Sequence, residues 1–267
     1  LCHSVQGGAE DIARLLGVPH EELRFRAAGI NHMAWFLDLW RGNENLYPRF
    51  RQAAESNTEW ADRNLVRNEI MRAFGYFPCE SSSHHAEYYP YFRKNERALE
   101  RYHQSPRTVD PNGGYERRDA QWQSEEMQAI LSGEKEIDLT PSNEFAAVII
   151  NSMVTGQPGK IYANVKNGGL IPNLPPDCIV EVPALVDFNG WQPCHAGELP
   201  PQLVALNSAH VSVHRVAVAA WKEKSREKAI QAMTLDPLAA AVLTLDEARA
   251  MANELLDSQP EHLGYLK

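Results

Sequence analysis

The middle of the chain carries two strand-like runs joined by a connection rich in glycine and proline. The first run begins at Lys160 and reads KIYANVK, and the second run ends in CIVEVPALV. Between them stands NGGLIPNLPPD, which has neither the glycine spacing nor the strand-to-helix context of a dinucleotide-binding loop. Apolar runs on either side of such a connection pair as neighbouring antiparallel strands, so the pattern predicts a small antiparallel sheet with a tight turn.

Helical patterns surround this sheet and dominate the chain. From Pro200 to Tyr265 apolar residues recur at helical spacing almost throughout, and Ser4–Leu16 shows the same spacing before Gly17. One strand is expected over residues 25–40, and a buried helix is expected over residues 144–154. The expected fold class is therefore α+β and predominantly helical, with residues 1–267 forming one domain.

Composition and charge argue against two classes of partner. Hydrophobic residues make up 43% and charged residues 23% of the 267 residues, as in ordinary folded proteins. The net charge of −9 gives no electrostatic reason to bind nucleic acid or an anionic membrane. No apolar run approaches the roughly 20 residues that cross a bilayer. We therefore expect neither nucleic acid nor a membrane as a partner.

The cysteines and the first residues indicate a cellular context. The four cysteines are sparse and form no CxxC pair; they are Cys2, Cys79, Cys178 and Cys194. This usage favours a reducing, cytoplasmic compartment. The chain opens at Leu1 without an initiator methionine or a signal peptide, so we expect it to be part of a longer protein.

Two sets of residues have side chains suited to chemistry. The first is Cys2-His3 with Asn31-His32, because a thiolate and an imidazole suit a borderline transition metal. The second is the segment of residues 74–92, where Glu80, His84 and His85 lie among aromatic residues and could supply acid–base groups.

Each set also has a purely structural interpretation. Cys2 and His32 could be packing residues, and the serines after Glu80 could cap the helix that follows them. His210 and His214 lie four residues apart on an expected helix, without a third ligand, and we interpret them as an ordinary polar edge.

Four separated motifs, in order, resemble glycoside hydrolase family four. They are CHSVQ at residues 2–6, AGINHMAWF at 28–36, the segment 74–92 and NGGLIPNLPPDCIVEVP at 167–183. The likeness is strongest to the bacterial α-galactosidases of that family. It implies a C-terminal domain like that of lactate and malate dehydrogenases. The family's N-terminal Rossmann domain, which binds most of the NAD, is missing from this chain, so no NAD-binding residue is expected here.

The resemblance also implies a mechanism and a metal site. Enzymes of this family are NAD-dependent exceptions among glycosidases. NAD⁺ takes hydride from C3 of the sugar, a base removes the C2 proton, and the aglycone leaves by elimination. Mn²⁺ binds the C2 and C3 oxygens, and Cys2 and His32 match its protein ligands. Asn31 matches a residue that touches substrate, whereas His3 replaces an Asp general acid and could donate a proton or recognise an unphosphorylated sugar.

The base at C2 is not settled by the resemblance. Relatives carry Tyr or Asp near the position of Ser81, and a serine is no base unaided. We predict Glu80 as the base, with His84 and Tyr88 as alternatives.

The function expected from these points is hydrolysis of α-galactosides, with a small-molecule sugar as the partner. An α-glucosidase or α-galacturonidase of the same family is the alternative within the enzyme class. A non-catalytic oligomerisation module is the alternative outside it. The apolar helix over Leu203–Ala220 could pack against a second subunit, and the family resemblance implies a homodimer or homotetramer.

Overall fold

The computed structural model describes residues 4–104, 124–137 and 144–267 and divides the chain into two units. The larger unit joins residues 1–104 to residues 144–267, and the smaller unit spans residues 105–143. In the smaller unit residues 124–131 are helical, and the Lys135 ammonium pairs with the Glu126 carboxylate. All elements named below belong to the larger unit.

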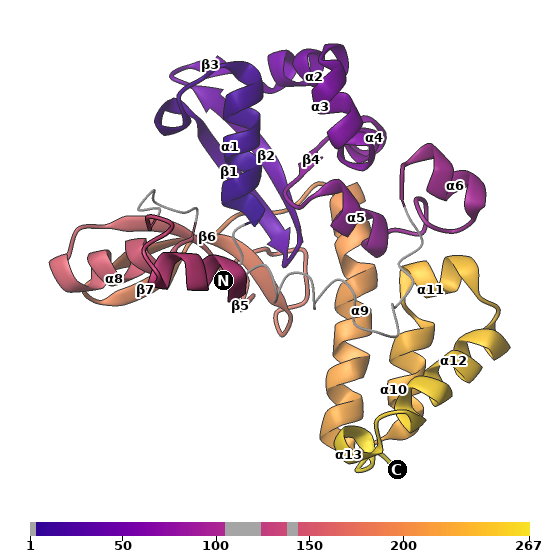
Figure 1. The fold of residues 1–267 in the computed structure, drawn as a ribbon. Coiled ribbons are helices and arrows are strands. Elements are labelled where there is room, and N and C mark those ends of the chain that lie inside the picture. The colour runs from indigo at the N-terminus through magenta and orange to yellow at the C-terminus, as the bar shows by residue number, and fades with distance from the viewer. Residues whose placement is uncertain (1–3, 105–123, 138–143) are drawn as a thin grey trace. The chain divides into compact units, whose positions relative to one another are not determined.

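The described residues form one seven-stranded antiparallel sheet with the order β3-β2-β1-β6-β5, while β4 pairs with β2 and β7 with β6 (Figure 1). The strands are β1 Arg24–Ile30, β2 Met33–Arg41, β3 Glu44–Asn45, β4 Phe77–Pro78, β5 Gly159–Lys166, β6 Ile179–Asp187 and β7 Gly190–Pro193. The β1–β2 hairpin meets the β5–β6 pair where Gly29 lies opposite Glu181. The two strand-like runs of the sequence are therefore confirmed as the antiparallel pair β5–β6.

Helices make up most of the remaining described chain, so the predominantly helical α+β class is confirmed. They are α1 Ser4–Leu16, the 3-10 turn His20–Glu22, α2 Tyr47–Ser56, α3 Thr58–Arg63, α4 Leu65–Phe74, α5 Ser82–Tyr88, α6 Glu96–Arg101, α8 Ala146–Thr155, α9 Pro201–Glu223, α10 Arg226–Thr234, α11 Pro237–Val242, α12 Leu245–Asp257 and α13 Pro260–Leu263. The early helices lie around the β1–β2 hairpin, and α9 leads to the helices of the C-terminal end (Figure 1). Helix α4 ends at Gly75 with φ of 85°, a left-handed conformation that glycine adopts readily at the end of a helix.

Aromatic side chains fill the core beneath the hairpin. Trp35, Phe36 and Phe77 are fully buried, and the Phe50 ring meets the Phe77 ring edge-on at 4.9 Å between centroids. The Trp35 indole donates to Asn207 Oδ1 at 2.8 Å, which joins strand β2 to helix α9. This core fixes the hairpin whose tip carries the candidate site.

The single strand expected over residues 25–40 is a hairpin. Ile30 and Met33 are its last paired residues, and the two-residue turn between them is Asn31-His32. The expectation was wrong because apolar residues continue on both sides of the turn. Neither turn residue is a glycine, which usually marks such a turn.

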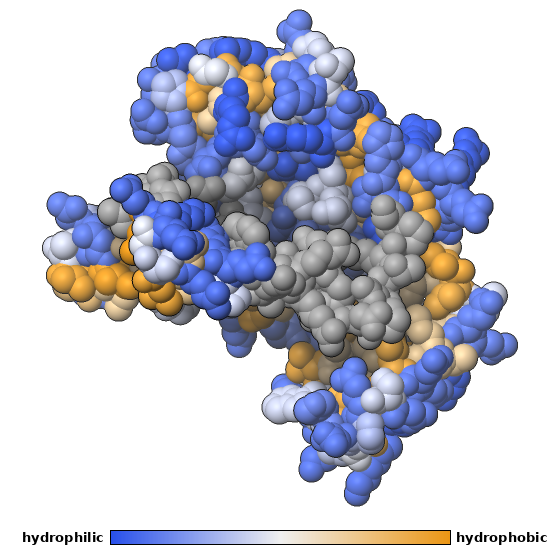
Figure 2. Space-filling view, viewed as in Figure 1, coloured by the Kyte–Doolittle hydropathy of each residue, from blue (hydrophilic) through white to orange (hydrophobic). Residues whose placement is uncertain are grey.

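The helix predicted over residues 144–154 is present as α8, but it is not buried. Ile150 is 63% exposed and Val154 is 80% exposed. Only one face of the helix packs on the sheet. On that face Ser152 lies so close to Gly159 of β5 that a Cβ added at Gly159 would be 2.5 Å from Ser152 Oγ. Hydrophobic side chains gather over this part of the surface (Figure 2).

Helix α9 contradicts the expectation that no run is long and apolar enough to span a bilayer. It has 23 residues and a window of mean hydropathy 1.2, of which 28% is buried. Core helices of other proteins meet the same test, so length and composition alone decide nothing. In this chain Asn207 and His210 on α9 bond to the hairpin and to α5, so the helix is part of the folded unit.

Candidate active site

The site begins at the tip of the β1–β2 hairpin. His32 occupies the second turn position with φ of 60°, a left-handed conformation that glycine adopts more easily than histidine. Gly29, just before the turn, is required by close packing, because a Cβ there would lie 2.3 Å from the Met33 carbonyl oxygen. Asn31 is exposed at the same turn. The hairpin thus presents an imidazole at its end in a conformation that the backbone favours little.

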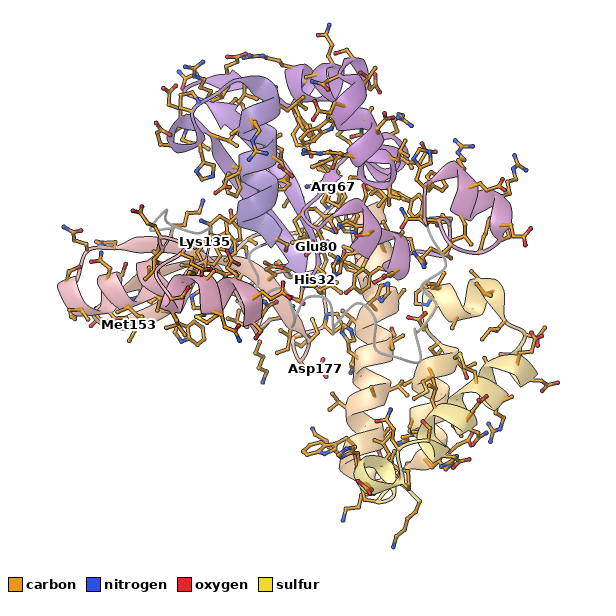
Figure 3. All side chains as sticks on the ribbon, viewed as in Figure 1. His32, Arg67, Glu80, Lys135, Met153 and Asp177 are labelled. Carbon is orange, nitrogen blue, oxygen red and sulfur yellow. The ribbon has the colours of Figure 1, made fainter. Side chains whose placement is uncertain are left out.

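Strand β4 brings a carboxylate to this imidazole. Pro78 pairs with Trp35 on β2, and the Cys79 amide donates to the Ala34 carbonyl at 3.0 Å. Glu80 follows directly, and its Oε2 lies 3.8 Å from His32 Nε2 (Figure 3). The hairpin turn and the segment around Glu80 therefore lie close together.

Helix α5 supplies the partners on the other side of His32. The Tyr88 hydroxyl lies 3.2 Å from His32 Nδ1, and the His84 ring meets the His32 ring edge-on at 5.4 Å. Because Tyr88 occupies Nδ1, Nε2 is the nitrogen that faces Glu80. His84 is itself held by Ser81 Oγ, 3.1 Å from its Nδ1. The Ser81 hydroxyl also caps α5, as predicted.

His210 was interpreted as an ordinary polar residue, and that interpretation is wrong. It is buried on α9, its Nε2 lies 2.8 Å from the Tyr88 carbonyl oxygen, and its ring packs on the Tyr88 ring. Burial lowers the pKa of His210, against the bond to Tyr88, which raises it. His210 therefore fixes the end of α5 that carries Tyr88. Its position among apolar residues of a helix was the one available signal.

His85 holds the backbone of Glu80 through a hydrogen bond. It is fully buried, and its Nε2 accepts the Glu80 amide at 3.2 Å. Burial first, and then the nearby Arg67 charge, hold the pKa of His85 well below its usual value. A neutral ring is the form that this bond needs, because a protonated Nε2 has no free electron pair.

Glu181 is a buried carboxyl that was not among the predicted site residues. It is fully buried on β6 opposite Asn164, and neither of its oxygens has a hydrogen-bond partner among the described residues. Burial, and then the charge of Glu80, raise its pKa to about 8. A charged residue between the valines of CIVEVP was the signal in the sequence.

The structure thus brings together four of the predicted site residues: His32, Glu80, His84 and Tyr88. Cys2 and His3 lie outside the described residues. Within the described part of the chain no group of three or more His, Cys, Asp or Glu side chains could hold a metal ion. His32 and Glu80 are therefore two donors that need a further ligand, and the roles assigned to all these residues stay predictions.

The chain matches the family 4 glycosyl hydrolase C-terminal domain over residues 27–239. It belongs to that family. It is 36% identical over 271 residues to an alpha-galactosidase of Bacillus subtilis (strain 168), covering 98% of this chain and 60% of that protein. It is 32% identical over 270 residues to an alpha-galactosidase of Rhizobium meliloti (strain 1021), covering 98% of this chain and 55% of that protein.

Solved structures of family 4 members share the fold. A candidate glucosidase of Bacillus subtilis, LplD, matches with a TM-score of 0.79 and 23% identity, over 96% of this chain and 62% of that one. A 6-phospho-alpha-glucosidase from gut microorganisms, solved with NAD and Mn²⁺, matches with a TM-score of 0.73 and 22% identity, over 98% and 59%. The present chain thus spans about 60% of the length of these relatives.

Proposed function

We propose that this chain is the sugar-binding part of an α-galactosidase that works with NAD⁺ and a divalent metal. The two alpha-galactosidases with 36% and 32% identity support the substrate. The observation that carries the chemistry is the placement of His32, with Tyr88 at Nδ1 and the Glu80 carboxylate facing Nε2.

The donor set fits Mn²⁺. An imidazole nitrogen is a ligand type that Mn²⁺ accepts, and the nearby Glu80 carboxylate adds a negative charge that attracts the cation. A histidine that binds a metal usually engages its other ring nitrogen with an outer partner, as Tyr88 does here. His32 would hold the metal through Nε2, and Cys2 is the second ligand that the family resemblance implies. The Mn²⁺ of the related 6-phospho-alpha-glucosidase structure supports this choice of metal.

The chain's own residues would hold the sugar and move its proton. When bound, NAD⁺ would supply a hydride acceptor and the metal, held by His32, would supply a Lewis acid for the sugar's oxygens. Glu80 removes the C2 proton. Its Oε1 accepts the Ser81 amide at 2.8 Å, so Oε2, which faces His32, is the oxygen that takes the proton. His84 and Tyr88 line the same side and are the alternative bases. Following the family resemblance, binding of NAD⁺ falls mainly to an N-terminal domain outside these 267 residues.

Two features of the whole protein belong to the same proposal. The described cysteines Cys79, Cys178 and Cys194 are free, which supports a cytoplasmic location. The exposed apolar residues of α9, Val218 at 50% and Trp221 at 64%, support a homodimer or homotetramer.

Titration of the purified chain with Mn²⁺ tests the function. We expect binding that His32→Ala weakens by about 100-fold, because a ligand is lost. The exposed His195→Ala is the matched control and should leave the affinity unchanged. The loaded chain is then titrated with melibiose and with a digalacturonide.

Absence of Mn²⁺ binding, or equal affinity in His32→Ala, would favour a non-catalytic module. Binding of the acidic sugar alone would replace the α-galactoside with an α-galacturonide.

A further inference from the structure

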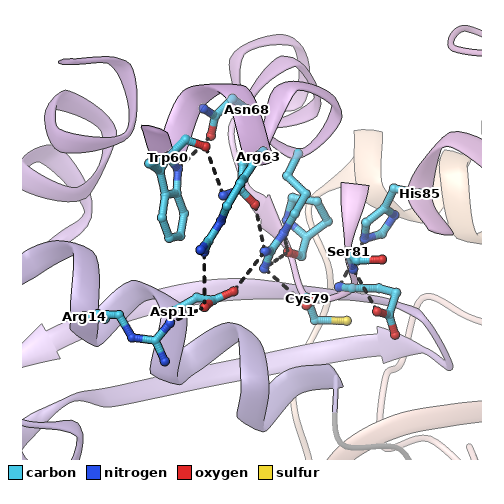
Figure 4. A network of polar contacts seen from close by, with 12 residues as sticks. Asp11, Arg14, Trp60, Arg63, Asn68, Cys79, Ser81 and His85 are labelled. Carbon is cyan, nitrogen blue, oxygen red and sulfur yellow. Dashed lines mark hydrogen bonds and ion pairs between the residues drawn. The ribbon is translucent and has the colours of Figure 1, made fainter. Parts of the chain in front are cut away.

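A buried guanidinium lies behind the segment that carries Glu80. Arg67 on α4 is 3% exposed. It donates to the carbonyl oxygens of Pro78 at 3.4 Å and Cys79 at 3.3 Å (Figure 4). Its remaining nitrogen donates to Asn64 Oδ1 at 3.0 Å and lies 3.5 Å from Asp11 Oδ2. One side chain thus joins α1, α4 and the end of β4.

This arrangement is poorly explained by stability alone. Burial lowers the pKa of Arg67, and the Asp11 carboxylate opposes that shift. A buried guanidinium contributes little net stability compared with an apolar side chain of similar volume, because its charge loses its hydration. What the guanidinium supplies is a planar set of donors in fixed directions. Its stacking on the Phe77 ring, at 4.2 Å from the centroid, fixes that plane.

Helix α1 contacts the same segment along one face. Ser4 Oγ lies 3.5 Å from the Cys79 Sγ, and a Cβ at Gly8 would lie 2.9 Å from the Cys79 carbonyl oxygen. Asp11 completes this face through Arg67. Ser4, Gly8 and Asp11 are spaced by four and three residues, which places them on one side of the helix. The Cys79 peptide is therefore held from α1 and α4 together.

Because the Cys79 peptide is held on both sides, the backbone of the next residue, Glu80, has little conformational freedom. Its own amide donates to His85 Nε2 at 3.2 Å, and its Oε1 accepts the Ser81 amide at 2.8 Å. The carboxylate is thus directed by backbone contacts on both sides, and Oε2 faces His32 at 3.8 Å. A shift of the Cys79 carbonyl would move the whole group.

We propose that Arg67, paired with Asp11, is a positioning residue that holds the Cys79 carbonyl and thereby directs the Glu80 carboxylate at His32. The inference deepens the proposed function and rests on it for its meaning. Arg67 lies away from the sugar and acts only through Glu80. Through Asp11, helix α1 takes part in the same set of contacts. Helix α1 begins two residues after Cys2.

Amide hydrogen exchange of the 267-residue chain tests the geometry without a metal or a substrate. In Arg67→Lys, which keeps the charge but loses the fork, we expect the Glu80 and Ser81 amides to exchange about tenfold faster. Amides of the β5–β6 ladder should exchange as before. Asp11→Asn should also make the Glu80 and Ser81 amides exchange faster.

Arg63→Met is the matched control for this experiment. Arg63 also lies near Asp11, at 3.8 Å, but it is exposed and has no bond to the carbonyls of Pro78 or Cys79. It should leave both amides unchanged. Unchanged exchange in Arg67→Lys, or equal acceleration in the β5–β6 ladder, would overturn the proposal.

Mn²⁺ affinity then tests whether Arg67 acts through Glu80. Arg67→Lys should weaken binding by about tenfold, because the negative charge of Glu80 would move away from the cation that His32 holds. In a Glu80→Gln background the same change should matter less than about twofold, because the group being positioned has lost its charge. An equal loss in both backgrounds would contradict the role. Failure of the unaltered chain to bind Mn²⁺ would instead remove the proposed function, and hydrogen exchange would still decide on Arg67.

Discussion

Glu181 is a carboxyl group in the interior of the sheet, between the buried Val180 and Val182. An acid in such a place stays protonated well above its usual pKa, because its charged form would lose hydration without a hydrogen-bond donor. The charge of Glu80 acts in the same direction. At neutral pH the Glu181 carboxyl is therefore mainly in its uncharged form.

The stability of the protein should fall with rising pH because of Glu181. Its pKa is raised from 4.5 to about 8, so between these values the folded chain holds a proton that the unfolded chain has released. Unfolding then releases a proton, and stability is lost as pH rises through this window, at about 1.4 kcal/mol per unit of pKa difference. Denaturant titrations at about pH 5 and about pH 9 measure the loss.

Glu181→Gln should remove this dependence, since an amide does not titrate. Glu198→Gln, at an exposed position, should retain it. An unchanged slope in Glu181→Gln would show that another group is responsible. The groups facing Glu181 to be checked in that case are Glu80, Cys79 and Tyr162.

Single residues could be predicted where polar atoms stand among aromatic ones. Glu80 and His84 were singled out this way, because so many polar groups are unusual in a core segment. Tyr88 was named only after the family resemblance. His210 and Glu181 were missed, since each is a lone polar residue in an apolar run and gains its meaning only from a partner far along the chain.

At the scale of elements, helix α1 matters more than its length indicates. Gly7 and Gly8 are neighbours in its first half, yet they meet different surroundings. A Cβ at Gly7 would contact nothing within 4 Å, whereas one at Gly8 would lie 2.9 Å from the Cys79 carbonyl and 3.0 Å from the Phe36 ring. The helix therefore needs only one of its two glycines for packing.

These two glycines should respond oppositely to alanine. Gly7→Ala should raise the free energy of unfolding by about 0.5–1 kcal/mol, because alanine favours the helix. Gly8→Ala should lower it by about 1–3 kcal/mol, because the added methyl group overpacks against backbone. Denaturant unfolding of both variants measures the pair. Equal signs would mean that α1 does not pack on the Cys79 peptide as described.

Elements with clear end signals were predictable. Gly75 closes α4, and Gly17 follows α1. The β1–β2 hairpin was not, because neither of its turn residues, Asn31 and His32, is a glycine that would mark a turn. The break between α3 and α4 at Asn64 has no such signal, since the apolar pattern continues across it.

At the scale of the whole molecule, the helices of the C-terminal end leave apolar surface uncovered. A groove of about 530 Å³ is lined by residues of α9, α10 and α12 with the last residues of the chain, among them Trp221, Met233 and Tyr265. Such a surface is typical of a contact between subunits.

A charge in this groove should separate the proposed subunits. We expect Trp221→Asp to shift the sedimentation coefficient towards that of a monomer, because the charge would be buried on association. Ala205→Asp places the same charge at another exposed position of α9 and should have no effect. A monomeric parent protein, or an unchanged oligomer in Trp221→Asp, would contradict the expected assembly.

The turn at His32 has a consequence for how this protein tolerates change. Its backbone conformation suits asparagine or glycine better than an imidazole-bearing residue. Selection for stability alone would therefore favour replacement of His32 by another residue. A library of variants screened for heat resistance should enrich the small residue there, and a screen for metal retention should restore the ring.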